Sequence, residues 1–549
     1  MRRTPREPTP SAAPIRRPGP RIGRRRFLRW LAACAGAAAL PWPLSSCGGG
    51  GDETPSVPRN RDLAVVGGGI AGLYAAWRLA HAGNRVTLLE AHDAASRTGF
   101  RRVLGGRIAT TTAAFDPALV YEAGAEFVFG SDEDLIETLF ALSSETGIDV
   151  RPVPVTGEDL LYLDPASVAG SGGRFRWAGG LRESADAGLF DGHLHPDAVA
   201  DLASGGRLET RLGRLYAEIE EPIWDTDPRR VTLGGVTIDD MTLFDVLTHP
   251  EIDLHPDAIV AIEAWFEDEN GVSIRDVSGL YGTDELYYIM YDRSWSRSPG
   301  TGPRGLDPIG FYRVPGGNDR LVLAFEQALA TAGVTLRTGE RVTHLRQPPS
   351  GGVELTTSAG STVFVDGAVL TAPPPALRAM AFDPPLPAAH ARYVAETVYT
   401  SYIKVALHFD DRPWERFPDS QGGVFVTSDR MPGSVAAIPT AQPGNRNAAL
   451  LALLSGRDAA AFEALRQGAT SGAQLDAALA RLRTDIDAIW PGILSDPSYR
   501  SGEDRVMPWI GTALPYPRPG GNGQSGDVYR LLPAPITAAG SVVFAGDGV

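Results

Sequence analysis

Four residues near the start of the folded region have the types and spacing of a dinucleotide site. Gly67, Gly69 and Gly72 form the pattern G-x-G-x-x-G, and Glu90 lies 23 residues after the first glycine. In such a motif the first glycine permits a tight turn, the second lets the backbone approach a pyrophosphate, and the third lets helix and strand pack closely. The acid accepts hydrogen bonds from ribose hydroxyls. The pattern predicts that a dinucleotide binds here.

A second chemical signal comes from the use of lysine. The chain has 51 lysine and arginine residues, and Lys404 is the only lysine among them. Arginine is permanently charged and fork-shaped, whereas lysine is a compact donor whose pKa falls readily on burial. A general bias toward arginine accounts for the other cations, but it makes the one remaining lysine informative. We therefore expect Lys404 to be a site residue.

The residues around the glycines predict a strand, a turn, a helix and a second strand. A short apolar run precedes the glycines, a helical pattern covers about 71–82, and a second apolar run covers 86–89. The N-terminus of a helix carries backbone N–H groups without partners inside the helix, and such groups bind phosphate. We expect the dinucleotide to contact Ile70 and Ala71 at the helix start, and Ala91 beside the acid.

Length and composition predict a soluble, globular chain with more than one domain. A chain of 549 residues is too long for one core. The net charge of −15 argues against nucleic acid as a partner. After the N-terminus no stretch reaches the roughly 18 apolar residues that a membrane span needs. The two cysteines, Cys34 and Cys47, lie near the N-terminus, so we expect no disulfide and no metal site in the mature chain.

The first sixty residues predict export rather than a fold. Arg24-Arg25-Arg26-Phe27-Leu28-Arg29 resembles a twin-arginine signal, and Leu44-Ser45-Ser46-Cys47 is similar to a lipoprotein cleavage site. Residues 1–47 are then the signal, and 48–60 form a flexible linker. The predicted location is the periplasmic side of the cell envelope, with a lipid on Cys47 as the only membrane contact. A plain cleaved signal with an incidental cysteine is the alternative.

Two further motifs carry a family resemblance. They are Gly105-Gly106-Arg107-Ile108 and Tyr121-Glu122-Ala123-Gly124-Ala125-Glu126-Phe127-Val128. Their order after the glycines and the acid resembles the flavin-dependent amine oxidase family, which includes monoamine, polyamine and L-amino-acid oxidases. The resemblance implies FAD rather than NAD, with Gly106 and Arg107 against the phosphates and the flavin edge, and Ala125 and Glu126 beside the flavin. Glu126 is either a partner of the substrate ammonium or a structural acid on the flavin side, and both alternatives stay open.

Two later segments resemble the family's other cofactor contacts. A strand is expected over 336–345, and the resemblance implies that Val342 pairs through its backbone with adenine. Residues 542–549 resemble the closing strand, in which Asp547 takes the place of a glutamate that contacts the ribityl or phosphate region. Family members continue with a glycine-rich turn and a helix, so we expect the third cofactor segment to be truncated.

The strand around Lys404 resembles the one that carries the family's active-site lysine. The resemblance implies that Lys404 positions a water beside flavin N5 and does not act as a nucleophile. Thr512 stands where some members carry the cysteine that anchors flavin, which implies non-covalent FAD. Ala513 stands where they carry an aromatic cage residue, and Trp509 is the first candidate to replace it, followed by Tyr516.

Five aromatic residues form a cluster inside a region of mostly helical periodicity. They are Tyr281, Tyr287, Tyr288, Tyr291 and Trp295. Clustered aromatics pack in a core more often than they line a ligand site, and both roles stay open. Asp and Glu are abundant in this region, which could attract cationic amines.

The predicted fold class is α/β, with a doubly wound, Rossmann-like FAD-binding domain and a discontinuous α+β substrate-binding domain. The cofactor domain is expected from 60–132, 309–392 and 501–549, and the substrate domain from 133–308 and 393–500.

The predicted function is oxidation of an amine or amino acid to an imine, with O2 reduced to H2O2. The expected partners are that small-molecule substrate and O2, and no oligomeric state is predicted. L-amino-acid oxidases often carry an arginine just after the Gly-Ala stretch, and its absence at 125–127 favours amines slightly. The alternatives are a related FAD-dependent desaturase or protoporphyrinogen-type oxidase, and a degenerate flavin-binding lipoprotein without activity. The lysine strand argues against the first alternative.

Overall fold

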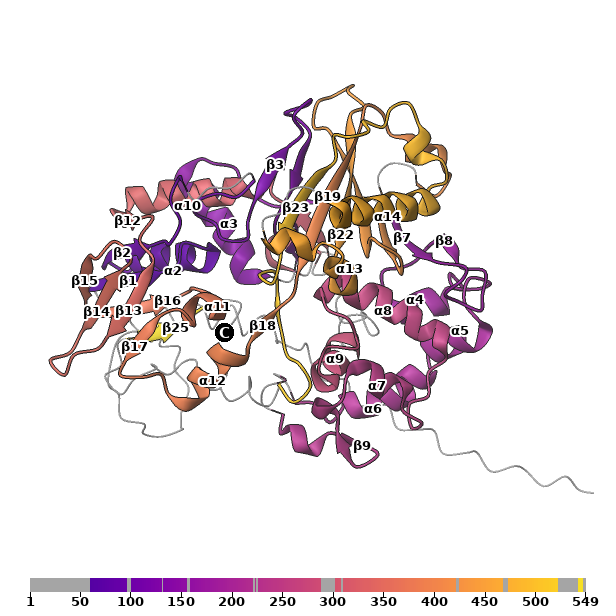
Figure 1. Cartoon of the computed structure of the whole chain (residues 1–549), viewed down its shortest axis with the longest axis horizontal. Helices are drawn as coiled ribbons and strands as arrows, with labels where there is room; N and C mark the ends of the chain where they lie inside the picture. The colour runs from indigo at the N-terminus through magenta and orange to yellow at the C-terminus, as the bar shows by residue number, and fades with distance from the viewer. Residues whose placement is uncertain are drawn as a thin grey trace, which may run out of the picture.

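A computed structural model of the chain contains a five-stranded parallel sheet and a seven-stranded sheet as its two largest sheets in the described residues. It describes residues 60–95, 100–130, 132–155, 158–220, 223, 226–287, 302–307, 310–420, 424–467, 472–521 and 542–546. Figure 1 shows the first sheet and its helices on the left, the second sheet at the upper right, and a group of helices below it.

The first sheet is parallel and has the strand order β12-β2-β1-β16-β25. Its strands are β1 (Asp62–Val66), β2 (Arg85–Leu89), β12 (Thr335–Arg337), β16 (Gly367–Leu370) and β25 (Val542–Phe544). Four of the five residues of β1 and all four of β16 are buried, as expected for strands covered on both faces. Each neighbouring pair is parallel. The predicted α/β class is confirmed.

Different layers cover the two faces of this sheet. One face packs against α2 (Ile70–His81), α3 (Glu133–Thr146) and α10 (Asp319–Thr331). The other packs against a four-stranded sheet of order β15-β14-β13-β17. The strands of that sheet are β13 (Val342–Arg346), β14 (Val353–Thr357), β15 (Thr362–Val365) and β17 (Ala381–Asp383). The chain leaves it through α11 (Pro374–Leu377), α12 (Ala388–Glu396) and β18 (Val398–Tyr399).

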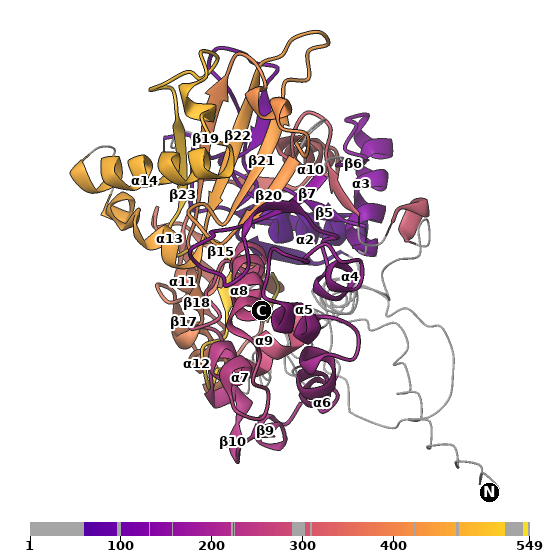
Figure 2. The same cartoon turned by 90° about the vertical axis from the view of Figure 1, so that its right-hand side faces the viewer.

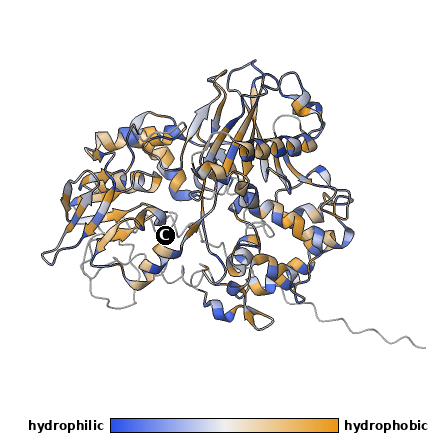
Figure 3. Cartoon of the chain, in the orientation of Figure 1, coloured by the Kyte–Doolittle hydropathy of each residue, from blue (hydrophilic) through white to orange (hydrophobic). Residues whose placement is uncertain are grey.

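The second large sheet has seven strands in the order β23-β19-β22-β21-β20-β7-β8. They are β7 (Glu158–Leu163), β8 (Gly173–Arg176), β19 (Tyr402–Phe409), β20 (Val424–Ser428), β21 (Ser434–Pro439), β22 (Ala448–Leu454) and β23 (Arg505–Trp509). One face packs on α14 (Ala473–Ile489), and the other turns toward β3 (Thr110–Thr112) and β4 (Val120–Glu122). Figure 3 shows that its central strands are largely hydrophobic, whereas α14 mixes both kinds of residue.

Helices of residues 181–285 form one core below this sheet, as the turned view in Figure 2 shows. They are α4 (Leu181–Asp186), α5 (Pro196–Leu202), α6 (Gly213–Tyr216), α7 (Leu243–Thr248), α8 (Pro256–Asn270) and α9 (Gly279–Glu285). A π-helical turn at Leu208–Leu212 leads directly into α6.

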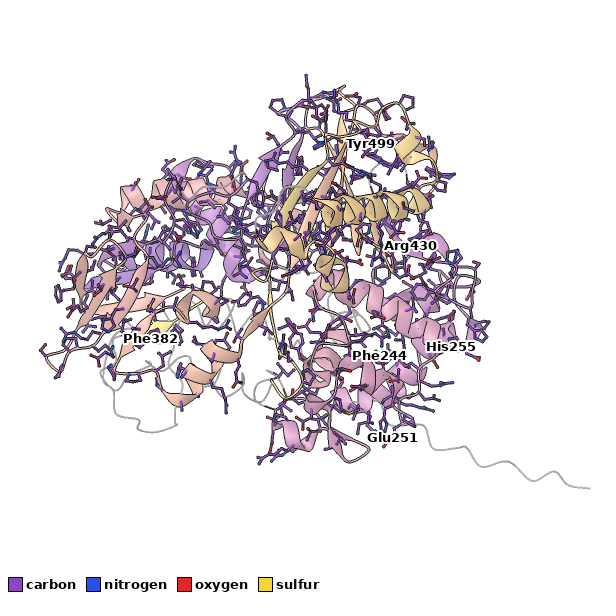
Figure 4. All side chains as sticks on the ribbon, in the orientation of Figure 1. Phe244, Glu251, His255, Phe382, Arg430 and Tyr499 are labelled. Atoms are coloured by element: carbon purple, nitrogen blue, oxygen red, sulfur yellow. The ribbon has the colours of Figure 1, made fainter. Side chains whose placement is uncertain are left out.

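The sequence His-Pro-Asp-Ala begins two neighbouring helices of this group. His195 caps α5 and His255 caps α8, and each imidazole accepts from the backbone N–H two residues later, at 3.2 Å. The two rings stack with centroids 4.4 Å apart, and Figure 4 labels His255 at this end of the group. The paired caps fix the start of α8, whose other end reaches the seven-stranded sheet.

Three segment assignments differ from the sequence expectation. The cofactor domain is predicted to resume at 501, but β23 pairs with β19 and β24 (Pro515–Tyr516) pairs with β18. The stretch 336–345 is two strands separated by a turn at Gly339, where φ is +73°. The predicted insertion begins at 133, but α3 packs in the core of the cofactor domain. Periodicity identifies an apolar face or strand, and the partner that covers it comes from elsewhere in the chain.

Short strands and turns complete the described structure. β5 (Val128–Phe129), β11 (Phe311–Arg313) and β6 (Val153–Pro154) form a three-stranded sheet, and β9 (Thr232–Leu233) pairs with β10 (Val236–Thr237). Among the described helices none is both long and apolar enough to cross a membrane.

Candidate functional site

The turn between β1 and α2 has the shape that a pyrophosphate requires. Gly67 has φ +114°, and a Cβ on Gly72 would lie 1.9 Å from the carbonyl oxygen of Gly67, so α2 starts directly against the turn. At Gly69 the surroundings are open, because an added Cβ would meet only the Cα of Gly106, at 3.9 Å, among the described residues. The backbone at Gly69 and the start of α2 can therefore approach a phosphate group.

Glu90 lies at the end of β2 beside this turn. The backbone N–H of Gly68 donates to its Oε2 at 2.6 Å, and the backbone N–H of His92 donates to its Oε1 at 2.9 Å. Burial raises the pKa of Glu90, but the hydrogen bonds from His92 and Gly68 outweigh burial and hold that pKa below its ordinary value. The carboxylate is thus ionised at neutral pH and suited to accept from ribose hydroxyls. Ala91 follows it and is half-buried.

The predicted adenine contact lies on the same side of the sheet. The backbone N–H of Glu340 donates to the carbonyl of Glu90 at 2.9 Å, so the chain that leads into β13 runs beside the acid. Val342 begins β13 and is buried. This places the Val342 backbone near the ribose-binding position, as its assigned role requires.

The end of β25 also reaches the glycine turn. A Cβ on Gly546 would lie 3.9 Å from the Cβ of Ala71, at the start of α2. Ile70 and Ala71 are half-buried there. Asp547, the next residue in the chain, lies outside the described residues, so its contact with the cofactor stays a prediction.

The second glycine motif packs against the first. A Cβ on Gly106 would lie 3.1 Å from the Cα of Gly69. The guanidinium of Arg107 donates to the carbonyl of Ala513, and the carbonyl of Arg107 accepts from the backbone N–H of Ala125 at 3.0 Å. Arg107 and Ala125 therefore lie together where the cofactor domain meets the seven-stranded sheet. With the glycine turn and Glu90, these residues fit a dinucleotide.

Lys404, on β19 of the seven-stranded sheet, holds the segment that follows β4 through its ammonium group. Its Nζ donates to the carbonyls of Glu122 at 3.1 Å and Gly124 at 3.0 Å, and to Oε2 of Glu126 at 2.7 Å. The residue is 6% exposed. An ammonium has three N–H donors, and all three are used here. Holding a water beside the flavin, the role that the resemblance gives Lys404, requires one of these bonds to open.

Glu126 lies between two cations. Its Oε2 accepts from Lys404 and its Oε1 pairs with the guanidinium of Arg313, on β11. Burial raises the pKa of Glu126, but the charges of Lys404 and Arg313 outweigh burial and hold that pKa below its ordinary value. Glu126 is therefore an ionised bridge in a Lys–Glu–Arg network. Of its two predicted roles, this arrangement favours the structural acid, since both carboxylate oxygens already have cationic partners.

Glu122 is a second buried acid next to Lys404. Its Oε1 accepts from the backbone N–H of Asn318 at 2.7 Å, and its Oε2 accepts from Oγ1 of Thr110 at 2.8 Å. Burial raises the pKa of Glu122 to about 7, although these hydrogen bonds and Lys404 lower it in part. This carboxyl therefore changes charge near neutral pH.

Trp509 supports the segment that Lys404 holds. Its indole N–H donates to the carbonyl of Ala123 at 2.6 Å, between the two carbonyls that Lys404 contacts. The guanidinium of Arg101 lies 4.3 Å from the centre of the indole, and Phe100 packs edge-on at 5.5 Å. Trp509 is 5% exposed. These contacts give Trp509 a positioning role beside the site, and a cage role for it stays a prediction.

The other candidate aromatics lie in the helical core where they are described. Tyr281 and Tyr287 pack against that core, and Tyr287 stacks on Tyr216 with ring centres 4.5 Å apart. Tyr516 also packs there, while Ala513 is buried and Thr512 is exposed. Three members of the cluster lie outside the described residues: Tyr288, Tyr291 and Trp295.

Three residues around Lys404 and Glu126 were not predicted as site residues: Glu122, Arg313 and Asn318. Glu122 had a readable signal, since Glu122, Gly124 and Glu126 alternate and so share one side of an extended chain. Arg313 is one of 50 arginines, so nothing in its type singles it out. Its contact depends on the pairing of β11 with β5, which local sequence does not specify.

Comparisons with known proteins agree with this geometry. The sequence profile described as flavin-containing amine oxidoreductase matches residues 70–549. Polyamine oxidase 4 of Oryza sativa subsp. japonica is 24% identical over 385 residues, which are 66% of this chain and 63% of that protein. An L-glutamate oxidase precursor of Streptomyces viridosporus is 28% identical over 406 residues, which are 65% of this chain and 54% of that protein. The chain thus spans less than two thirds of each relative.

A solved structure shares the fold. A triple mutant of putrescine oxidase superposes with a TM-score of 0.63 and 19% sequence identity, covering 89% of this chain and 93% of the other. The sequence profile covers most of the chain, including Gly72, Glu90 and Lys404. The chain belongs to the flavin-containing amine oxidoreductase family.

Proposed function

We propose that this protein is an FAD-dependent amine oxidase that converts a small amine to an imine, which water hydrolyses to an aldehyde and ammonia. The observation that carries the proposal is the contact of Lys404 with residues 122–126. It places the chain's one lysine, buried, between the dinucleotide-binding domain and the face of the second sheet. The polyamine oxidase and putrescine oxidase similarities support the amine class.

The chain's own residues bind the cofactor and set the charge around it. FAD, the cofactor of this family, supplies the acceptor for the hydride equivalent and passes the electrons to O2, which becomes H2O2. The glycine turn and the start of α2 would hold its pyrophosphate, and Glu90 would accept from its ribose hydroxyls. Thr512 stands where some members of the family carry the cysteine that anchors flavin, so the proposed binding is non-covalent.

The Lys–Glu–Arg network contributes a positive field. Lys404 and Arg313 carry two positive charges against the one negative charge of Glu126. Charges in a protein interior act more strongly than in water because the effective dielectric constant is lower. The network therefore favours negative charge nearby, which suits a site where a substrate gives up electrons to a neighbouring acceptor.

Amino acids are the second candidate substrates. The similarity to an L-glutamate oxidase favours them, and an arginine is the residue that best holds a substrate carboxylate. Arg313 is the arginine described beside Glu126, but its guanidinium pairs with that acid. A substrate carboxylate would have to displace Glu126, so we place amines first.

One experiment separates these functions. The purified protein with FAD is assayed for peroxide release over matched amines and amino acids, together with its absorbance spectrum. A flavin spectrum and peroxide from amines support the proposal. Peroxide from amino acids alone would instead support amino acids as the substrates. Turnover of a polyene or porphyrinogen without any amine, or protein without a flavin band, contradicts it.

We also propose that the protein is exported and anchored by a lipid on Cys47, from its signal-like N-terminus. Membrane fractionation of the full chain and of a Cys47→Ala variant tests this. The full chain should appear in the membrane fraction, and the Cys47→Ala variant should leave that fraction. Equal distribution of both proteins contradicts the anchor.

A further inference from the structure

Asp268, near the end of α8, is a carboxylate without a cationic partner in the described part of the chain. Its Oδ1 accepts from Oγ of Ser434 at 2.5 Å and its Oδ2 lies 3.5 Å from Oγ1 of Thr427. The residue is half-buried, and a carboxylate removed from water is costly unless it is paired with a positive charge. Its hydroxyl partners hold the carboxylate in place but supply no charge.

Asp268 and Lys404 stand over the same row of the seven-stranded sheet. Lys404 is opposite Leu453, Leu453 is opposite Ser434, and Ser434 is opposite Thr427. Paired residues of neighbouring strands project to the same face. Ser434 is two strands from Lys404, and strands lie about 4.8 Å apart, so the two positions are about 10 Å apart across the sheet.

The surface between these two ends is apolar. Leu453 is the residue between them in the row, and it is half-buried rather than fully buried. Phe425 lies two residues before Thr427 on the same face and packs against the core there. A ligand that follows this row meets a charged network at one end, an apolar centre, and a carboxylate at the other end.

The charges that face Asp268 are negative. Burial is the main cause that raises the pKa of Asp268 to about 7, and the charges of Glu269 on α8 and Glu126 at the other end of the row raise it further. Tyr402, on β19, donates its hydroxyl to the carbonyls of Asp268 and Glu269 and remains protonated, because burial raises its pKa well above the ordinary value. A cation arriving with the substrate would relieve this accumulation of negative charge.

We propose that Asp268 binds a second cationic group of the substrate, so that the preferred substrates are diamines or longer polyamines rather than monoamines. This inference rests on the proposed amine oxidation. The reacting amine lies at the Lys404 end, the methylene chain follows Leu453, and the distal ammonium pairs with Asp268 at a reach of about 10 Å.

The test compares substrates of equal chain length in the FAD-loaded enzyme. Alkyl monoamines and α,ω-diamines are assayed with wild type and with Asp268→Asn, and the ratio of kcat/KM for diamine over monoamine is the readout. The variant should lower that ratio roughly 10- to 100-fold, as expected for loss of a charge-assisted hydrogen bond. Asp276→Asn, the same change at an exposed position of the same region, should leave the ratio unchanged.

The pH dependence supplies a second readout. Asp268 binds a cation only when ionised, so the diamine-to-monoamine ratio of wild type should rise with pH through about 7. In Asp268→Asn the ratio should not change over this range. Ser434→Ala removes a hydrogen bond that lowers the pKa of Asp268, so the rise should move to higher pH.

Binding without turnover completes the test. Calorimetry with a bis-quaternary alkane diammonium, and with the mono-quaternary compound of equal length, should show tighter binding of the dication in wild type and a smaller difference in Asp268→Asn. If wild type and Asp268→Asn both oxidise monoamines, with the same diamine-to-monoamine ratio of kcat/KM and the same difference in affinity between dication and monocation, the role of Asp268 is overturned and the proposed function is not. A flavin that no amine reduces would instead overturn the proposed function.

Discussion

At the scale of the residue, Lys404 combines a structural and an electrostatic role. Its three hydrogen bonds all end on residues 122–126, so one side chain fixes the path of this segment beside the cofactor domain. Trp509 holds the carbonyl of Ala123 between them. Removing either side chain would release the same short stretch of backbone.

The first prediction concerns the variant Lys404→Met. It leaves two buried carbonyls without their donor and Glu126 with Arg313 alone, so the free energy of unfolding should fall by about 3 kcal/mol. FAD should remain bound, because the glycine turn and Glu90 are untouched. Amine-dependent reduction of the flavin, or its reoxidation by O2, should slow at least tenfold by anaerobic stopped-flow absorbance.

The variant Lys404→Arg is the matched control. It keeps the positive charge but replaces a compact ammonium with a planar fork, so it should restore stability better than activity. Both half-reactions proceeding at the wild-type rate in Lys404→Met would rule out the proposed role.

The second prediction uses the raised pKa of Glu122. Its ordinary value is 4.5 and its value in the folded protein is about 7. Folding then favours the protonated acid, so this contribution to stability is complete below pH 4.5 and is lost as pH rises toward 7. The loss is at most about 3 kcal/mol. Asp268, whose pKa is also about 7, contributes in the same window.

The measurement is the melting temperature between pH 5 and 8. Glu122→Gln should remove about half of the decline that wild type shows. Glu218→Gln, at an exposed glutamate, should decline like wild type. A slope that Glu122→Gln leaves unchanged would contradict the buried titration.

Single residues differ in how far the sequence predicts them. Lys404 and Glu90 were predictable, one from its uniqueness in the composition and the other from its spacing to the glycines. Asp268 was not, because the run Glu267-Asp268-Glu269-Asn270 has the composition of an exposed helix end. Only the docking of α8 onto β20 and β21 brings that acid, half-buried, against Thr427 and Ser434.

At the scale of the element, two glycines in the turn into α2 have different roles. Gly72 is required by packing, since a Cβ there would lie 1.9 Å from a carbonyl oxygen. Gly69 has room for a Cβ in the protein itself. The missing side chain at position 69 instead leaves room for the pyrophosphate of the ligand.

The third prediction follows from this difference. Gly69→Ala should leave the melting temperature of the apoprotein within experimental error and weaken FAD binding at least tenfold, because the methyl group occupies the approach of the pyrophosphate. Gly72→Ala should lower the melting temperature of the apoprotein itself. Fluorescence titration with FAD and calorimetry of the apoproteins provide the two readouts, and equal effects in both variants would contradict the assignment.

Elements were predictable where all their determinants are local. The strand–turn–helix–strand unit around Gly67 is confirmed, since its hydrophobic periods and its glycines lie within thirty residues. The hairpin of β14 and β15 is local in the same sense, since its two strands are close neighbours in the chain. The place of β23 was not predictable, because its partner β19 lies about a hundred residues earlier in the chain.

At the scale of the whole molecule, the cofactor site draws on three distant parts of the chain. The glycine turn, the strand that begins at Val342 and the residue Gly546 meet at one edge of the parallel sheet. The fold class was predictable because the resemblance fixed this order of segments. The relative placement of the second sheet depends on contacts such as that of Lys404, which no segment specifies alone.

The fourth prediction is that FAD stabilises the protein as one unit. A ligand that binds only the folded state adds about 2.7 kcal/mol at one hundred times its dissociation constant. Because the ligand would contact all three segments, calorimetry should show one transition that moves to higher temperature with added FAD. Two transitions, with only one responding to FAD, would show that the segments do not form a single unit. As a control, the melting transition of Gly69→Ala should shift little with added FAD.

The single lysine also determines how this protein reacts with lysine-directed reagents. Its surface offers arginines but no lysine amine, since Lys404 is 6% exposed and lies under a segment that it holds by three bonds. Acylating reagents, amine-directed cross-linkers and lysine-specific proteases therefore have no side-chain target on the intact fold. Any acylation found at position 404 records an opening of the active centre, so the chain carries its own single-site probe of that opening.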